Sequence, residues 1–400
     1  MTDRRTGAPR SSDTAAQTAI ADMLRRLVAF DTTSRNSNLA LIDFVRDHLR
    51  DLGIDSQLIA DDTGRKANVY ATIGRSEGSG LMLSGHTDVV PVDDQDWHSD
   101  PFALTERDGR LHGRGACDMK GFIAVVLASL PALAETVRGR PLHLAFTFDE
   151  EVGCIGATRL AQQLRGLPTR PAFCLIGEPT GMRIVDGHKG RLAMRCHVHG
   201  AEGHSAYPGA ACNAVEIAAD MIARLRLMAR RLRDEGPFDT AYEPPHTTVQ
   251  TGTVHGGVAL NIVPRDCTFD FEVRNLPTQD PLVLIAELKS FALGELLPEM
   301  RRAAPQAAIA FEQMSHVPGL IPDLDHDLAR AALSASDGNA TQKVSFGTEA
   351  GLYQAAGLRT IVCGPGDIAQ AHKPDEFVSI EQLARCRAFL ARVVGDICGA

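Results

Sequence analysis

The feature of this sequence that most constrains its fold is a set of short apolar runs that are each followed by a carboxylate or a histidine. The runs and the residues after them are Leu81–Gly85 before His86, Leu142–Phe148 before Glu150 and Glu151, Phe173–Ile176 before Glu178, and Ile361–Cys363 before His372. Helical patterns separate the runs, which is typical of an α/β domain with a largely parallel sheet. Open α/β sheets build their sites at the carboxyl ends of their strands, so we expect these side chains to gather there.

The order of the expected elements changes between residue 184 and Pro318. Inside this stretch the candidate strands and helices follow each other as Leu192–Val198, Asn213–Arg233, Thr247–Thr253, Thr268–Val273, Pro281–Arg302 and Ala307–Glu312. This β-α-β-β-α-β order is typical of a two-layer, ferredoxin-like split βαβ fold. We therefore expect a mixed, mostly parallel α/β domain with helices on both faces from residues 1–183 and 319–400, and an inserted α+β domain from residues 184–318.

The start of the chain is polar, and we expect residues 1–17 to be flexible. Helical spacing over residues 18–53 is interrupted by Asp31–Ser34, a polar break that we expect to cap the second helix. Apolar stretches stay shorter than the roughly 20 residues that cross a bilayer. The N-terminus also lacks the apolar run of a secretory signal. We expect neither a membrane protein nor an exported one.

The composition excludes some classes of partner. The chain has 41 Lys and Arg against 50 Asp and Glu, a net charge of −9. Nucleic-acid binding requires a basic surface, so this balance argues against such a partner, and Arg224–Arg233 is expected to be a solvated helix face. The nine cysteines are scattered and form no C-x-x-C pair. This usage indicates buried, reduced thiols and a cytoplasmic protein.

Residues near the expected sheet edge form a donor set for a pair of divalent ions. The set consists of His86, Asp118, Glu151, Glu178 and His372, where Asp118 lies in the glycine-rich loop Gly113–Gly121. Imidazole nitrogens and carboxylate oxygens, with one carboxylate able to bridge, suit such a pair. Three carboxylates without a metal would repel one another, so a cation would stabilise the cluster. Asp88, two residues after His86, is placed to orient its imidazole.

Each of these signals has a plainer interpretation when it is taken alone. A histidine at a strand end is most often structural, an aspartate in a glycine-rich loop is usually a turn former, and a glutamate pair usually lies in a solvated loop. The coincidence of all of them at one expected edge favours a shared site.

Several segments in combination resemble the di-zinc M20 family of metallopeptidases and deacylases, over nearly the whole chain. They are His86–Pro91, Trp97, Asp100–Phe102, Gly113–Gly121, Asp149–Gly153 and Gly177–Thr180. The resemblance implies two divalent ions, zinc or cobalt, that are bridged by Asp118. It implies that His86 and Glu178 complete one metal site and that Glu151 and His372 complete the other.

The same resemblance implies that Glu150 is the general base, which takes a proton from a water between the two ions. Neighbouring residues of an extended strand point to opposite sides of the sheet. Glu150 and Glu151 must share one site, so we expect both to lie in a turn beyond the strand.

The inserted domain has its own implied roles. Gly200–Pro208 resembles the family's loop whose histidine, here His204, reaches across a homodimer and stabilises the oxyanion in the neighbouring active site. Asn261, Arg274 and Gly347 are implied to bind the substrate. The guanidinium of Arg274 suits a carboxylate.

Within the family, Phe346–Gly351 and Gly364–Phe377 resemble the members that deacetylate acetylornithine. The resemblance implies removal of the acetyl group from N2-acetyl-L-ornithine, giving acetate and L-ornithine for arginine biosynthesis. We expect Glu349 to face the side-chain amine of ornithine, although it can equally be a helix-start carboxylate. The alternative functions are those of other deacylases or exopeptidases of the family, namely an aminoacylase, a succinyl-diaminopimelate desuccinylase or a carboxypeptidase.

Overall fold

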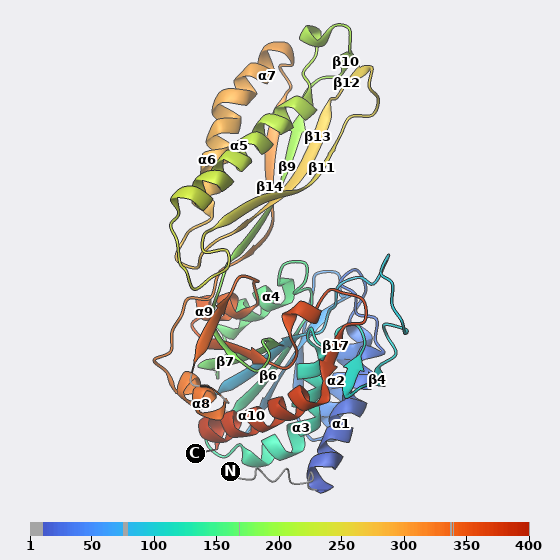
Figure 1. Cartoon of the computed structure of the whole chain (residues 1–400), viewed down its shortest axis with the longest axis vertical. Coiled ribbons are helices and arrows are strands. Elements are labelled where there is room, and N and C mark those ends of the chain that lie inside the picture. Colours follow the sequence, from blue (N-terminus) through green and yellow to red (C-terminus); the bar gives the residue numbers. More distant parts are fainter. Residues whose placement is uncertain (1–10, 75–78, 168, 337, 339, 400) are drawn as a thin grey trace, which may run out of the picture. The chain divides into compact units, whose positions relative to one another are not determined.

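The computed structural model describes residues 11–74, 79–167, 169–336, 338 and 340–399 of the chain. The chain divides into two compact units (Figure 1). The first unit comprises Met1–Asp186, Pro322–Gln342 and Thr348–Ala400, and the second comprises Gly187–Ile321 and Lys343–Gly347. The segment Lys343–Gly347 therefore belongs to the second unit, whereas the sequence pattern places it in the first.

An eight-stranded sheet lies at the centre of the first unit, in the order β1-β2-β6-β3-β7-β16-β8-β15. Its strands are β1 Ser56–Ala60, β2 Ala67–Ile73, β3 Leu81–His86, β6 Leu142–Thr147, β7 Phe173–Pro179, β8 Ile184–His188, β15 Thr341–Val344 and β16 Arg359–Gly364. The central pairs β6–β3, β3–β7 and β7–β16 are parallel, whereas β1–β2, β2–β6 and β16–β8 are antiparallel. All residues of β3, β6 and β7 are buried, as expected of parallel strands covered on both faces.

Helices cover both faces of this sheet, which confirms the predicted fold class (Figure 1). One face carries α1 Ser11–Val28, α2 Leu39–Asp51, α3 Lys120–Thr136, α8 Asp327–Ala335 and α10 Ile380–Cys398, and the other carries α4 Ile155–Leu164 and α9 Ala350–Ala355. A small sheet of β4 Thr105–Arg107, β5 Arg110–His112 and β17 Phe377–Ser379 completes the unit, with a short 3-10 turn, η3, at Ile368–Gln370.

Two expectations for the N-terminal region need correction. Residues 1–10 lie outside the described part of the chain, but Ser11–Gln17 belong to helix α1 rather than to a flexible arm. Alanines in this segment favour the helix. Helix α2 begins at Leu39, after an Asn38 whose side chain makes no capping hydrogen bond, so Asp31–Ser34 does not cap it. The Ser34 hydroxyl instead donates to Asp88 Oδ2 at 2.7 Å.

The second unit has the predicted β-α-β-β-α-β order. A four-stranded antiparallel sheet in the order β11-β13-β9-β14 packs against helices on one face. The elements are β9 Arg191–His199, β10 Gly203–His204, η1 Pro208–Ala210, α5 Ala214–Glu235, β11 Thr248–Gly256, β12 Ile262–Val263, β13 Asp266–Arg274, α6 Leu282–Phe291, the π-helical turn η2 Ala292–Leu296, α7 Leu297–Ala303 and β14 Ala308–Val317. Alternate residues of β13 are buried, because only one face of this sheet is covered.

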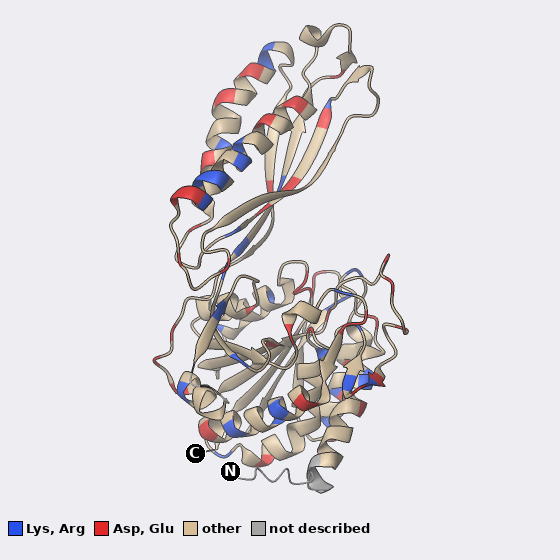
Figure 2. Ribbon diagram, in the orientation of Figure 1, with Lys and Arg blue, Asp and Glu red and all other residues tan. Residues whose placement is uncertain are grey.

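Charged residues of both signs are interspersed along the helices of the second unit (Figure 2). Arg224 and Arg231 of α5 both donate to the carboxylate of Glu287 on α6. All nine cysteines are free and buried, as predicted. Among the described residues, the helices lack the combination of length and apolar character that crossing a membrane requires.

Candidate metal centre

The first unit brings all five predicted metal ligands together, each from a different segment. His86 is the last residue of β3, and Glu178 is the second-last residue of β7. Asp118 precedes α3, Glu151 follows β6, and His372 follows β16. The ligand atoms form two groups in which all atoms lie within 4.8 Å of one another, and Asp118 belongs to both. One group is completed by His86 and Glu178, and the other by Glu151 and His372.

The distances within the two groups are short. His86 Nε2 lies 3.0 Å from Asp118 Oδ1 and 3.9 Å from Glu178 Oε1. His372 Nε2 lies 3.4 Å from Asp118 Oδ2 and 3.2 Å from Glu151 Oε2. The two oxygens of Asp118 thus face different histidines, which is the arrangement that a bridging carboxylate requires.

A glycine allows β7 to bring Glu178 close to the helix layer. A Cβ added to Gly177 would lie 1.9 Å from Cγ of Phe122 on α3, a distance that no side chain tolerates. Glycine therefore permits this approach of strand and helix directly before Glu178.

Asp88 contacts His86 through its main-chain oxygen rather than through its carboxylate. His86 Nδ1 lies 2.9 Å from the main-chain oxygen of Asp88, whereas the nearest carboxylate oxygen is 3.5 Å away. The carboxylate instead accepts hydrogen bonds from the backbone N–H groups of Glu150 and Glu151, at 3.0 and 3.2 Å. Backbone N–H groups in a partly buried turn need acceptors, and the Asp88 carboxylate accepts from both of these groups. Asp88 therefore fixes His86 through its backbone and the glutamate pair through its side chain.

The prediction that Glu150 and Glu151 lie in a turn is confirmed. Strand β6 ends at Thr147, and the N–H groups of Gly153 and Cys154 donate to the Glu150 carbonyl. Asp149 adopts a left-handed φ of 55° at the entry to this turn, and its carboxylate pairs with Lys66 at 2.5 Å. The reversal lets both glutamates reach the same site, which an extended strand would not.

Burial dominates the electrostatics of the carboxylates. It raises the pKa of Glu150 to about 8, and the neighbouring charge of Glu151 adds to this effect. Burial likewise raises the pKa of Glu178 and of Glu151. Burial also disfavours the charged form of Asp118, but hydrogen bonds from His372 and His86 outweigh it and lower the pKa of Asp118.

The histidines show the opposite response. Burial alone would lower the pKa of His86, yet hydrogen bonds to Asp118 and Asp88 raise it well above the ordinary value. Hydrogen bonds to Asp118 and Glu151 raise the pKa of His372 to about 10. The cluster thus attracts positive charge strongly, because several carboxylates share a buried space.

The donor set fits a pair of divalent cations. Among the described residues, the salt-bridge partners of Asp118, Glu151 and Glu178 are the two histidines. Imidazole and carboxylate are ligands of zinc and of similar ions, and they bind these ions in their deprotonated forms. Two groups with one shared carboxylate match what two neighbouring ions would need.

Glu349 is buried beside this cluster and directly precedes α9. Its carboxylate accepts hydrogen bonds from the hydroxyl groups of Thr147, Ser84 and Tyr353. Burial raises the pKa of Glu349. Its side chain makes no capping bond to α9, so the carboxylate points into the protein rather than serving the helix start.

The other predicted residues belong to the second unit. His204 is exposed on β10, and its Nδ1 accepts a hydrogen bond from the N–H of Ala206. Asn261 is exposed on the neighbouring loop, where its carbonyl accepts from Ser205. Arg274 ends β13 and donates to both carboxylate oxygens of Glu272, at 3.1 and 3.4 Å.

A cavity of about 500 Å³ lies within the second unit. Its lining includes Lys189, Glu272, Arg274, Ser345 and Phe346, and Gly347 follows directly in the chain. The Lys189 ammonium donates to two backbone carbonyls, and Arg274 contributes a guanidinium. The balance of charge in the lining is positive, which suits an anionic group of a ligand.

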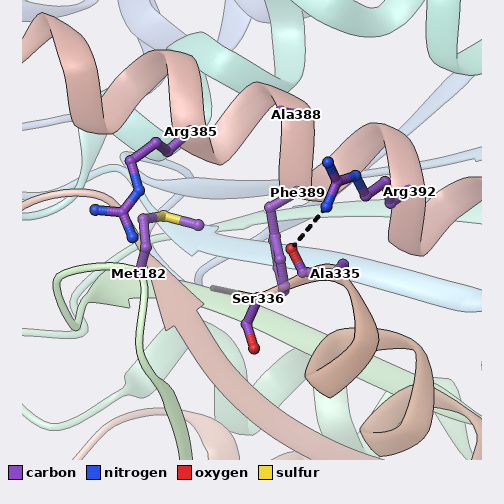
Figure 3. A pocket seen from close by; sticks show the side chains of 7 residues that line it. All are labelled: Met182, Ala335, Ser336, Arg385, Ala388, Phe389 and Arg392. Atoms are coloured by element: carbon purple, nitrogen blue, oxygen red, sulfur yellow. Dashed lines mark hydrogen bonds between the residues drawn. The ribbon is translucent and has the colours of Figure 1, made fainter. Parts of the chain in front are cut away.

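A second, smaller crevice lies between α8 and α10 in the first unit (Figure 3). Its volume is about 80 Å³, and α10 contributes Arg385, Phe389 and Arg392 to its lining. Arg392 reaches the carbonyl of Ala335 at 3.5 Å. Among the residues that the structure describes, the lining contains no carboxylate or histidine, and so no ligand set for a metal ion.

Known proteins resemble this chain over most of its length. The model of peptidase family M20/M25/M40 matches residues 82–396. An acetylornithine deacetylase of Myxococcus xanthus is 40% identical over 387 residues, which cover 95% of this chain and 98% of that protein. An acetylornithine deacetylase of Klebsiella pneumoniae is 35% identical over 363 residues, which cover 90% and 92%.

A solved structure shares the fold. The YXEP protein of Bacillus subtilis, described as a dinuclear metal binding peptidase from the M20 family, matches with a TM-score of 0.65 at 16% identity. The match covers 96% of this chain and 98% of that chain. Both units therefore have counterparts in a protein of low sequence identity.

Proposed function

The chain belongs to peptidase family M20/M25/M40 and is a hydrolase of that family, and from this premise we propose that it removes the acetyl group from N2-acetyl-L-ornithine. The products are acetate and L-ornithine, a precursor for arginine biosynthesis. The observation that supports the chemistry most directly is the pair of ligand groups sharing Asp118. The substrate is supported by relatives named acetylornithine deacetylase at 35–40% identity.

We assign His86, Asp118 and Glu178 to one divalent ion, and Asp118, Glu151 and His372 to the other. Zinc and cobalt both suit this mixture of imidazole and carboxylate ligands. When bound, two such ions would acidify a water and polarise the substrate carbonyl.

Glu150 is the general base of the proposal. Asp88 accepts the backbone N–H of Glu150 and fixes its turn beside the ligand cluster. Burial raises the pKa of the Glu150 carboxyl to about 8, which makes its carboxylate a stronger base than that of an exposed glutamate and suits it to take a proton from water and pass it to the leaving amine. The balance is simple: the water supplies its oxygen to the acetyl carbon as the amide C–N bond breaks, and both of its protons pass to the leaving nitrogen, giving acetate and the ammonium form of ornithine.

The substrate contacts are assigned to groups of fitting charge. Arg274, which lines the cavity of the second unit, would bind the α-carboxylate beside Gly347. Asn261 lies near Ser205 at the other end of β13, so it would reach the carboxylate from a second copy of the chain. Glu349 would favour the side-chain ammonium of ornithine by its negative charge near the cluster.

We further propose a cytoplasmic homodimer in which His204 of one copy donates a hydrogen bond to the oxyanion in the other. The edge strand β11 supports such an assembly, because it has no neighbour on one side within the described sheet. Val254 on this strand and Val258 and Leu260 after it are exposed. An unpaired edge with apolar side chains is a natural template for pairing with a second copy. The nine free thiols suit a reducing compartment.

A panel of substrates tests the proposed reaction. We expect acetylornithine to be hydrolysed with a higher kcat/KM than acetylmethionine, succinyl-diaminopimelate or a dipeptide, and a chelator to abolish the reaction. Preference for one of the other three compounds would assign the chain to an aminoacylase, a desuccinylase or an exopeptidase.

The variant Glu349→Gln tests the proposed contact with the side-chain ammonium. We expect the ratio of kcat/KM for acetylornithine to that for acetylmethionine to fall by about tenfold. An unchanged ratio would show that Glu349 does not contribute to substrate recognition.

A further inference from the structure

A buried carboxylate that the proposed chemistry does not use, Glu376, lies against the loop that carries Asp118. Its Oε1 accepts the backbone N–H groups of Cys117 and Asp118, at 2.8 and 3.0 Å. Its Oε2 accepts the N–H of Gly115 at 3.1 Å and a guanidinium N–H of Arg114 at 2.6 Å. Both charged side chains of this ion pair are 1% exposed.

The backbone of the same residue adds a further tie. The carbonyl oxygen of Glu376 accepts the N–H of Gly113 at 2.9 Å. Arg114 also donates to the Lys373 carbonyl at 3.4 Å and to Gln95 Oε1 at 2.6 Å. Gln95 in turn donates to the carbonyl of His372 at 3.2 Å. The network therefore joins the Asp118 loop to the segment that ends at Glu376 and begins at His372.

This loop needs external support because it belongs to no strand. Gly115 has a φ of 78°, and a Cβ there would lie 2.6 Å from Val89. The N–H groups of the loop converge on one carboxylate, as backbone N–H groups do in an anion-binding nest. Burying a charge pair is costly, and here four hydrogen bonds to the carboxylate offset that cost.

We infer that Glu376 is a positioning residue that sets the backbone of Asp118 relative to His372 and thereby determines the affinity for both metal ions; this inference rests on the proposed metal centre. Asp118 belongs to both ligand groups, so a displaced Asp118 weakens both sites together. Glu376 itself belongs to neither ligand group.

Glu376→Gln is the discriminating variant, because it keeps the size of the side chain. Glutamine has one acceptor oxygen and one NH2 group. Some of the N–H groups that donate to Glu376 would therefore face the NH2 group, which cannot accept their hydrogen bonds. We expect metal affinity to fall about 10- to 100-fold, the range found when partners of metal ligands are changed. Glu287→Gln is a matched control, since it also removes a carboxylate that accepts hydrogen bonds from arginine, here Arg224 and Arg231, but lies in the second unit.

The experiment titrates Co²⁺ into metal-free wild type, Glu376→Gln and Glu287→Gln, and follows visible absorption and heat of binding. It is run well below the melting temperature of the weakest metal-free variant, so a loss of global stability leaves the titration unchanged. We expect two ions with wild-type affinity for the control, and two weaker sites with altered absorption for Glu376→Gln. Wild-type affinity and spectrum in Glu376→Gln would overturn the inference.

Absence of binding by the wild type would instead refute the proposed metal centre, so the two failures are distinguishable. If Glu376→Gln does not fold, Glu376→Asp takes its place, because it keeps the charge but shortens the reach. We expect at least threefold weaker binding from that variant. Unchanged binding would overturn the inference equally.

Discussion

Asp118 belongs to both groups of potential ligands, so its position decides whether two ions can share the site. Its two carboxylate oxygens face His86 and His372, which lie far apart in the sequence. Asp88 places the glutamate turn, and among the described residues the salt-bridge partners of the clustered carboxylates are the two histidines. In the proposed mechanism, different residues hold the cations, move a proton and fix the backbone.

At the scale of single residues, we predict that a change at Glu150 affects catalysis without affecting metal binding. Glu150→Gln should lower kcat by about 10²- to 10⁴-fold, because the variant has no carboxylate to accept the proton of the water. KM and the number of bound ions should change little, since Glu150 is not among the ligands. Steady-state kinetics with elemental analysis of the same sample checks this prediction. A variant that loses its metal along with its activity would make Glu150 a ligand rather than a base.

At the scale of elements, the apolar runs predicted the central strands well because parallel strands are buried on both faces. β3, β6 and β7 were all visible as runs of apolar residues, and their ends located His86 and Glu178. The short edge strands, such as β1 and β15, lack that pattern because they are partly exposed. Helix α9 was also missed, since six residues are too few for a helical period to show.

The support of the site was less predictable than its ligands. Ser34 bonds to Asp88, 54 positions away, and Arg114 bonds to Glu376, 262 positions away. No local spacing announces such partners, because the topology of the sheet creates them. Ser34, Arg114 and Glu376 lie in segments that the sequence analysis singles out, namely Asp31–Ser34, Gly113–Gly121 and Gly364–Phe377, but their hydrogen-bonding roles are visible only in the structure.

Strand β6 contains a buried histidine, His143, that should make the folded protein less stable in acid. Burial lowers the pKa of His143 to about 4, whereas the unfolded chain has a pKa near 6.5. Acid therefore protonates the unfolded state first, and stability falls as the pH drops from 6.5 towards 4. The loss between pH 7 and pH 5 should be about 2 kcal/mol from this residue.

His143→Asn checks that prediction, because its amide oxygen can replace Nδ1 as the partner of Tyr70, which lies 2.8 Å away. In urea unfolding of metal-free protein, the loss of stability from pH 7 to pH 5 should shrink by about 2 kcal/mol. His255→Asn, on the exposed part of β11, is the control and should retain the full loss. An equal loss in wild type and His143→Asn would contradict the assignment.

At the scale of the whole molecule, the two units carry different parts of the proposed chemistry. The first holds all five potential ligands and Glu150, while the second holds His204, Asn261, Arg274 and Gly347. A homodimer would let a residue of one copy complete the site of the other. That arrangement is open to a direct genetic test.

Coexpression of Glu150→Gln with His204→Ala distinguishes action within one copy from action between copies. Each variant alone should lose at least about 100-fold in kcat, since a base or an oxyanion donor is missing. If His204 acts across the dimer, a mixed dimer regains one intact site of its two, and purified mixed dimers should recover about half of wild-type activity. Recovery is measured on mixed dimers purified with two different tags. No recovery would place His204 in its own copy's site or outside the chemistry.

The most direct measurement is a count of metal ions per chain, made on purified wild type and on Asp118→Asn after dialysis against zinc and then against metal-free buffer. We predict two ions per wild-type chain and a deficit at both sites in Asp118→Asn, because one carboxylate serves both groups. A wild-type chain that retains no zinc, or a variant that still retains two ions, would contradict the account.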